Sequence, residues 1–248
     1  MQFKNILAII IILILLFIFY LVLFVIDTKD DNEPVHKYDD IKKNLKTGDI
    51  ILFSCQYHSS LFNELEYIFR TKLLGSMYGH AAVVIKKNNG EIYITEVCNH
   101  DQCGYQEAHY LNNLNKGGAR IIKLDTILKK YYKEFNGIYA VKFISQEIPY
   151  SKMMEQLKKY KKITFRNNKV IFSLAAVDIF ISHSFSKKIS NSCSNNEMLC
   201  TEFLHDLLYN CGVLKKYPSK LFWPHLITSN IFDKLENVKY SKPYKFIV

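Results

Sequence analysis

The sequence predicts a mixed α+β domain, an antiparallel sheet packed with helices, that follows one N-terminal transmembrane helix. The first observation is an unbroken apolar run from Ile6 to Ile26. The second is a set of short apolar segments bounded by turn residues, as is typical of strands: 50–54, 80–86, 91–97, 119–124 and 138–145. The third is helical spacing of apolar residues at 60–74, 125–135, 150–162, 170–184 and 199–208. Residues 46–248 are therefore expected to form one α+β domain.

The apolar run is long enough to cross a membrane as a helix. Only the amphipathic Tyr20 interrupts its 21 residues, and about 20 apolar residues span the hydrocarbon core of a bilayer. It is too long for the apolar part of a signal peptide, and no cleavage site of small residues follows it. We expect a single-pass protein with an uncleaved anchor over residues 1–28, in contact with the lipid bilayer through this run. A polar stalk is expected over 29–45.

The lysines that flank the run favour a cytoplasmic position for the C-terminal domain. Lys4 precedes the run. Several lysines follow it closely: Lys29, Lys37, Lys42, Lys43 and Lys46. The flank richer in lysine and arginine generally stays in the cytoplasm, and the sequence holds no Asn-x-Ser/Thr sequon. A lumenal domain is the alternative.

The net charge of +10 comes almost entirely from lysine, which supplies 30 of the 33 basic residues. Proteins that read nucleic-acid bases rely on arginine for bidentate contacts and stacking. Arginine occurs here only as Arg70, Arg120 and Arg166, so we expect no specific nucleic-acid partner. A lysine-rich face near an anionic leaflet is a simpler use of the charge. Two still simpler explanations of the high lysine content are a solvated protein surface and the codon usage of a viral or AT-rich genome.

Six cysteines in a domain this large do not establish a disulfide framework, because a core of this size is stable without one. Free thiols are expected. Cys98, His100, Cys103 and His109 are zinc-capable side chains within one loop. Their spacing matches no common zinc finger, so we expect neither a metal nor a cofactor. The loop also follows Glu96 closely enough to line a substrate entrance.

The stretch 195–212 (NNEMLCTEFLHDLLYNCG) predicts a helix with Cys200 in its first turn and Gly212 at its end. Unpaired backbone N–H groups and the helix dipole favour an anion at such a position. A thiol there is biased toward the nucleophilic thiolate. The alternative is that Cys200 is a small buried apolar residue.

A cysteine nucleophile needs a base within hydrogen-bond reach and a third group that orients the base. His205 lies five positions beyond Cys200 on the same helix, so the two side chains diverge. His80 begins an apolar strand, and a hairpin turn at 87–90 would set it opposite Glu96 or Val97. An acid in that place can fix the imidazole tautomer and stabilise the imidazolium. The alternatives are a polar strand end for His80 and a solvated strand residue for Glu96.

These residues carry a family resemblance. The segments TGDIILF (47–53) and GHAAVVI (79–85), then Glu96, then LCTEFL (199–204) occur in this order. The chain resembles the circularly permuted branch of the NlpC/P60 papain-like superfamily, with its YiiX/YaeF-like and poxvirus virion members, which is related to the lecithin:retinol acyltransferase group. The resemblance implies a papain-like fold. It also implies that Cys200 is the nucleophile, His80 the base and Glu96 the orienting residue, and the segment 217–227 resembles the proline-containing loop after the cysteine helix.

The expected function is a membrane-anchored cysteine hydrolase, amidase-like or peptidase-like, that acts through an acyl-enzyme. Its substrate would be an amide or an ester, and the anchor makes a lipid-linked one a natural choice. One alternative is a lipid acyltransferase. The other is a non-catalytic, membrane-tethered binding or structural module that has a papain-like fold.

Overall fold

The computed structural model describes residues 35–54, 76–98, 109–111, 117–135, 137–166, 196–218 and 222–248, together with Leu16 and Thr71. The run from Ile6 to Ile26 lies outside this part of the chain except for Leu16. Among the described residues, no helix is both long enough and apolar enough to cross a membrane. The anchor therefore stays a prediction from the sequence. The helix expected at 170–184 and most of the one expected at 60–74 also lie outside the described residues.

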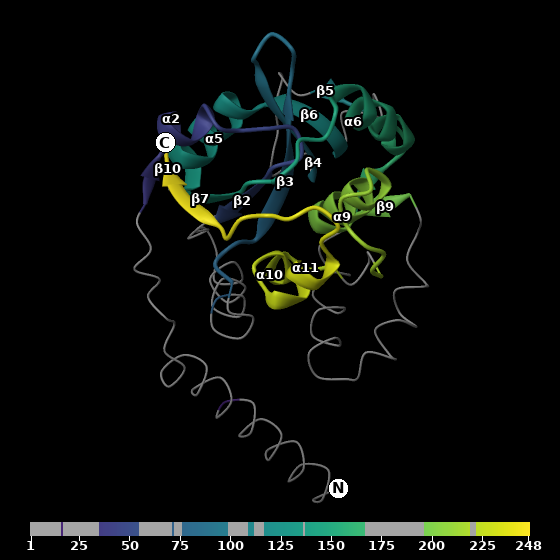
Figure 1. Ribbon diagram of the computed structural model, residues 1–248. Helices are drawn as coiled ribbons and strands as arrows, with labels where there is room; N and C mark the ends of the chain where they lie inside the picture. Colours follow the sequence, from purple (N-terminus) through teal and green to yellow (C-terminus); the bar gives the residue numbers. More distant parts are fainter. Residues whose placement is uncertain are drawn as a thin grey trace, which may run out of the picture.

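In the described part of the chain, one eight-stranded sheet organises the domain (Figure 1), with the strand order β1-β10-β7-β2-β3-β4-β6-β5. The strands are β1 (His36–Lys37), β2 (Ile50–Ser54), β3 (His80–Lys86), β4 (Ile92–Cys98), β5 (His109–Tyr110), β6 (Gly118–Lys123), β7 (Ile138–Lys142) and β10 (Tyr244–Ile247). Neighbouring strands are antiparallel except for β1 and β10, which run parallel. The expected antiparallel sheet and the α+β class are confirmed. A separate two-stranded sheet consists of β8 (Thr164–Phe165) and β9 (Glu197–Met198), which run parallel.

Helices cover both faces of the sheet (Figure 1). One apolar core contains side chains of α6 (Tyr150–Leu157), α9 (Cys200–Asn210), α10 (Pro224–Ile227) and α11 (Asn230–Leu235). The other contains side chains of α2 (Tyr38–Lys42) and α5 (Leu124–Phe135). A short 3-10 helix, η3 (Lys158–Tyr160), extends α6. The domain therefore has three layers, with the sheet in the middle.

Strand β2 shows why its sequence is apolar throughout. Ile50 and Leu52 point into one core, whereas Ile51 and Phe53 point into the other. Alternate residues of a strand face opposite sides of the sheet, so a strand covered on both sides has no solvent face for polar residues.

Residues 36–45, expected to belong to the stalk, are part of the domain. Tyr38, Ile41 and Leu45 are buried in the same core as α5. Their spacing of three and four residues is that of one helical face. The Tyr38 hydroxyl and Lys42 Nζ both donate to the Asp125 carboxylate, at 2.6 and 2.7 Å. These contacts fasten α2 to the start of α5.

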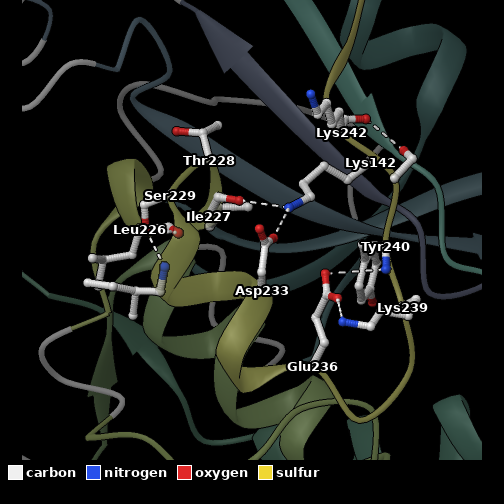
Figure 2. Close-up of polar contacts among 12 residues, drawn as sticks. Lys142, Leu226, Ile227, Thr228, Ser229, Asp233, Glu236, Lys239, Tyr240 and Lys242 are labelled. Carbon is white, nitrogen blue, oxygen red and sulfur yellow. Dashed lines mark hydrogen bonds and ion pairs between the residues drawn. The ribbon is translucent and has the colours of Figure 1, made fainter.

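The C-terminal helices are tied to the sheet through the buried Lys142 (Figure 2). Its Nζ donates to the Ile227 carbonyl at 3.0 Å, and the Asp233 carboxylate lies 3.9 Å away. The ammonium also lies 4.1 Å from the centre of the Phe232 ring. Burial lowers the pKa of Lys142, against the raising effects of Asp233 and Glu236. The end of α10 and helix α11 are thereby held against β7.

Candidate active site

Helix α9 begins at Cys200 because a buried carboxylate caps the turn in front of it. Leu199 is extended, with φ −88° and ψ 164°, and its N–H donates to Glu202 Oε2 at 2.7 Å. Glu202 in turn accepts from Arg166 Nη1 at 2.7 Å, and both side chains are buried. This cap, in which the Glu202 side chain accepts the Leu199 N–H, fixes where the helix begins. Cys200 is its first residue, where backbone N–H groups have no partner within the helix.

The body and end of α9 follow the sequence prediction. The buried face of α9 consists of Phe203, Leu204, Leu207 and Leu208, all in one core. Gly212 has a φ of +77°, the left-handed conformation that ends many helices. Helix α9 packs on β3 and β4. This packing directs the start of the helix toward the site described next.

The structure brings His80, Glu96 and Cys200 together. His80 is the first residue of β3 and lies opposite Phe53 of β2, with 5.3 Å between the two ring centres. Its Nε2 lies 2.5 Å from Glu96 Oε2. The Cys200 side chain also interacts with the His80 ring, and this interaction raises the pKa of His80. Because Nε2 is engaged by Glu96, Nδ1 is the ring nitrogen left for the sulfur.

The register of β3 against β4 is shifted by one residue from the expected register. Val83 pairs with Thr95 and Lys86 with Ile92, so Ala82, not His80, lies opposite Glu96. The loop between the strands includes Glu91, whose carbonyl accepts from Lys87 N–H at 2.9 Å, and is one residue longer than the sequence suggested. The Glu96 side chain therefore meets His80 along the diagonal of the sheet, which longer side chains can span.

A fourth charged residue completes the group. Arg120 lies directly opposite Glu96 across β4 and β6. Its Nε donates to Glu96 Oε1 at 2.8 Å, and its Nη2 donates to the same oxygen. Both side chains have no solvent exposure. One oxygen of Glu96 thus faces Arg120 and the other faces His80.

The charges of the group support one another. Burial by itself would lower the pKa of His80, but the charges of Cys200 and Glu96 and the hydrogen bonds to both hold it well above its usual value. Burial would raise the pKa of Glu96, but the charges of Arg120 and His80 and their hydrogen bonds lower it to about 2. These interactions favour a carboxylate at Glu96 and an imidazolium at His80.

Exposure is uneven within the group. The His80 side chain retains 16% of its accessible surface, and Cys200 retains 8%. Glu96 and Arg120 retain none. The two groups that would meet a substrate are therefore those nearest the surface, and the two that hold them lie beneath.

Sequence reasoning missed Arg120. The apolar pattern of 119–124 predicts a strand but does not predict that this strand pairs with the one that carries Glu96. One signal was available, since Arg120 is one of only three arginines among 33 basic residues. In a chain that uses lysine at nearly every basic position, an arginine indicates a position where a planar group with several donors is needed.

The loop after α9 is fastened to the first turn of the helix. Thr201 Oγ1 donates to the Phe222 carbonyl at 2.5 Å. The neighbouring Trp223 is buried, and its indole N–H has no hydrogen-bond partner in the described part of the chain. His205 packs against the Phe222 ring, with 4.9 Å between ring centres. Phe222 thus lies beside the first turn of α9, and His205 packs against it.

The described residues contain no group of three or more side chains that could hold a metal ion. Of the Cys98, His100, Cys103 and His109 quartet, only the Cys98 side chain is described, and it is buried. A cleft of about 400 Å³ is lined by residues 86–88 and 147–150. This cleft lies at the C-terminal end of β3, whereas His80 is at the N-terminal end, so the cleft does not belong to this site.

One curated relative shows the family. An uncharacterized protein of Acanthamoeba polyphaga mimivirus is 37% identical to this chain over 230 residues, which is 92% of each protein. The chain belongs to the same family as this mimivirus protein. No protein-family model matches the chain. Because the name of the mimivirus relative assigns no activity, any function for the family has to be argued from the site.

Proposed function

We propose that this member of the mimivirus protein family is a cysteine hydrolase of the permuted NlpC/P60 papain-like type, held at a membrane by the run from Ile6 to Ile26. Cys200 is the nucleophile, His80 the base and Glu96 the residue that orients the base. The substrate is an amide or an ester. The observation that carries the proposal is the 2.5 Å contact of His80 with Glu96, together with the interaction of His80 with Cys200 that raises the pKa of His80.

This arrangement meets the needs of nucleophilic catalysis by a thiol. The nucleophile must lie within hydrogen-bond reach of its base, and a third group must hold the base. The raised pKa of His80 favours the imidazolium beside the sulfur. The thiolate is the reactive form of cysteine, and a neighbouring imidazolium stabilises it.

The reaction proceeds in two halves. In the first, the Cys200 thiolate attacks the carbonyl carbon, a C–S bond forms, and the carbonyl electron pair moves to oxygen. Collapse of this intermediate breaks the C–N or C–O bond, and the leaving group takes the proton of His80. In the second half, neutral His80 removes a proton from water, which attacks the thioester. The C–S bond breaks, and the acid product leaves the thiolate–imidazolium pair behind.

Backbone groups at the start of α9 suit the negative charge that develops on the carbonyl oxygen. Cys200 and Thr201 are the first two residues of the helix. N–H groups of a first helical turn have no partners within the helix, and the helix dipole favours an anion there. Donors fixed in advance in this way stabilise an oxyanion without reorganisation.

The first test is the reactivity of Cys200 in the full chain in detergent micelles. Iodoacetamide labelling is followed by peptide mass mapping between pH 5 and pH 9. At pH 6 an ordinary thiol, with a pKa of about 8.5, is less than about 1% ionised. We expect Cys200 to label at pH 6 at least about tenfold faster than the buried Cys98 and Cys211. His80→Ala should abolish this advantage.

The second test is acyl transfer itself. The full chain is mixed with p-nitrophenyl acetate and p-nitrophenyl palmitate, and the acyl group is located by mass mapping. Acylation of Cys200 that is absent in Cys200→Ala and strongly reduced in His80→Ala supports the proposal. A Cys200 that neither labels at pH 6 nor accepts an acyl group refutes it and leaves a binding or structural module. Acyl groups that pass to an added alcohol rather than to water identify a transferase.

A further inference from the structure

Arg120 occupies a position that the chemistry of the triad does not by itself require. The chain uses lysine for 30 of its 33 basic residues, yet the residue opposite Glu96 is arginine. Arg120 has no solvent exposure, and burying a charge without a partner costs several kcal/mol. A buried arginine in a lysine-rich protein therefore points to a specific task at this place.

The geometry of the contact separates the two oxygens of Glu96. Arg120 Nε and Nη2 both donate to Oε1, whereas His80 Nε2 lies against Oε2. A guanidinium presents donors in a fixed plane, whereas a lysine ammonium is a single point charge on a longer, more flexible stem. Only one oxygen of the carboxylate is left for the imidazole, and the rotation of the carboxylate is fixed.

The charges of the four side chains cancel in the reactive state. A Cys200 thiolate and the Glu96 carboxylate are negative, and the His80 imidazolium and the Arg120 guanidinium are positive. The four groups are buried or nearly so, with 16% exposure of His80 the largest value. In such surroundings an uncompensated charge is expensive, and a neutral, hydrogen-bonded group of charges is not.

We propose that Arg120 is a positioning residue that supplies the fourth charge of the site and so allows Glu96 and the Cys200 thiolate to be negative at the same time. This inference rests on the proposed function, because it assigns Arg120 a task only if Cys200 acts as a thiolate. Arg120 does not touch the reacting atoms. It acts through Glu96, which holds His80.

Removal of Arg120 leaves the reactive state with a net charge of −1. A buried negative charge in excess is relieved by the uptake of one proton, either on the Cys200 thiolate or on Glu96. The first removes the nucleophile, and the second removes the acceptor that stabilises the imidazolium. Both routes lower the fraction of thiolate at a given pH, so the two possibilities share one observable consequence.

The test measures the rate of Cys200 alkylation against pH in the full chain. For Arg120→Met we expect a loss of about tenfold at pH 6, and a profile displaced by about one unit toward higher pH. The decisive variant combines Arg120→Met with Glu96→Gln. It restores neutrality, since only the thiolate and the imidazolium remain charged, and it should label at pH 6 no more slowly than Arg120→Met alone. A faster rate means that the proton in Arg120→Met is on Cys200, and an equal rate means that it is on Glu96.

Two further variants keep the test sharp. Lys142→Met removes another buried cation of the same sheet. Lys142 pairs with Ile50 of β2, whereas His80 pairs with Phe53, three residues further along that strand. It should leave the Cys200 profile unchanged even where thermal stability falls. If Arg120→Met does not fold, Arg120→Lys serves instead. Because it keeps the charge but loses the two planar donors, its rate at pH 6 should lie between that of the parent and that of His80→Ala.

The outcomes distinguish this inference from the proposed function. An Arg120→Met protein with the parent profile refutes the role of Arg120, as does a double variant that labels more slowly than Arg120→Met. An Arg120→Lys protein as slow as His80→Ala refutes it too. In each of these cases the parent still labels at pH 6 and loses this in His80→Ala, so the cysteine–histidine pair stands. A parent chain that does not label at pH 6 refutes the proposed function itself.

Discussion

Arg166 and Glu202 form an ion pair inside the protein, with 2.7 Å between Nη1 and Oε1, directly beside the start of helix α9. Arg166 Nη2 also donates to the Glu197 carbonyl at 2.8 Å, so the guanidinium links β9 to the helix. Glu202 Oε2 accepts the N–H of Leu199, the residue before Cys200. The two arginines of the described part of the chain, Arg120 and Arg166, are thus both buried, and each forms an ion pair with a glutamate of the candidate active site or its helix cap.

Arg166→Met should destabilise the protein by about 3–5 kcal/mol, because Glu202 would keep a buried charge without its partner. The free energy of unfolding, from urea titration followed by circular dichroism, measures this loss. A loss below about 1 kcal/mol would contradict the argument, since exposed ion pairs contribute no more than that.

A matched variant separates the charge from the packing. Arg166→Met combined with Glu202→Gln removes both charges, while the amide oxygen of the new side chain can still accept the Leu199 N–H. We expect this double variant to regain a large part of the lost stability. If it is as unstable as Arg166→Met alone, the loss comes from packing around the guanidinium.

Local patterns in the sequence predicted the elements of the site, and contacts between distant segments did not follow from them. The apolar spacing of 199–208 and Gly212 predicted α9 with Cys200 in its first turn, as the structure has it. The pairing of Arg120 with Glu96 depends on the register of β4 against β6, and that of Arg166 with Glu202 joins residues 36 positions apart. Neither pairing leaves a periodic signal in the chain.

The hairpin between β3 and β4 shows the same limit on a smaller scale. The turn residues predicted a loop at 87–90, and the loop also takes in Glu91. One additional residue shifts the partner of each strand position by one. The contact between His80 and Glu96 was expected from directly opposed residues, and it forms because a glutamate side chain reaches a diagonal neighbour.

Thr201→Val should loosen the segment around Trp223. The Thr201 hydroxyl is buried and donates to the Phe222 carbonyl at 2.5 Å, and valine leaves this carbonyl without its donor. A buried unsatisfied group costs about 1–3 kcal/mol. Because Trp223 is the only tryptophan, its fluorescence reports on this segment directly. We expect a shift to longer wavelength and stronger quenching by acrylamide.

Thr201→Ser is the control for this prediction, since serine keeps the hydroxyl and removes only the methyl group. It should give the parent emission spectrum. Equal spectra for Thr201→Val and the parent would show that the hydrogen bond does not hold the segment.

His205 should make the protein sensitive to acid. Burial lowers the pKa of His205, against the raising effects of the hydrogen bond to the Lys215 carbonyl and of Asp206. A histidine whose pKa is lower in the folded state binds more protons when the chain is unfolded. Stability is therefore lost as the pH falls below the ordinary value of about 6.5. His205→Leu should remove this part of the pH dependence.

The measurement is the free energy of unfolding of the parent and of His205→Leu at several pH values from 7.5 down to 5. The difference between the two should change in favour of the leucine variant as the pH falls. A difference that stays constant over this range would show that His205 is not the responsible group. Trp223 fluorescence in the same titration tests whether the Phe222 segment, which packs on His205, responds first.

Gly48→Ala should be more destabilising than Gly90→Ala, although both glycines have positive φ values, +106° and +84°. Left-handed backbone costs an alanine about 1–2 kcal/mol, and this is the whole effect expected at Gly90, where an added Cβ meets no atom within 4 Å. At Gly48 the Cβ would lie 2.8 Å from Ile148 Cδ1, which has to move. Overpacking of this kind adds about 1–3 kcal/mol.

The comparison tests whether the turn before β2 is built around this close approach. The Gly48 carbonyl accepts from the Tyr240 hydroxyl at 2.9 Å, and its N–H donates to the Val84 carbonyl at 3.0 Å, so the backbone is held from both sides. Urea midpoints of the two variants, measured beside the parent, give the difference. Equal losses at the two positions would mean that Ile148 yields without cost. The second variant Ile148→Val, combined with Gly48→Ala, should recover stability only if the contact with Ile148 is the cause.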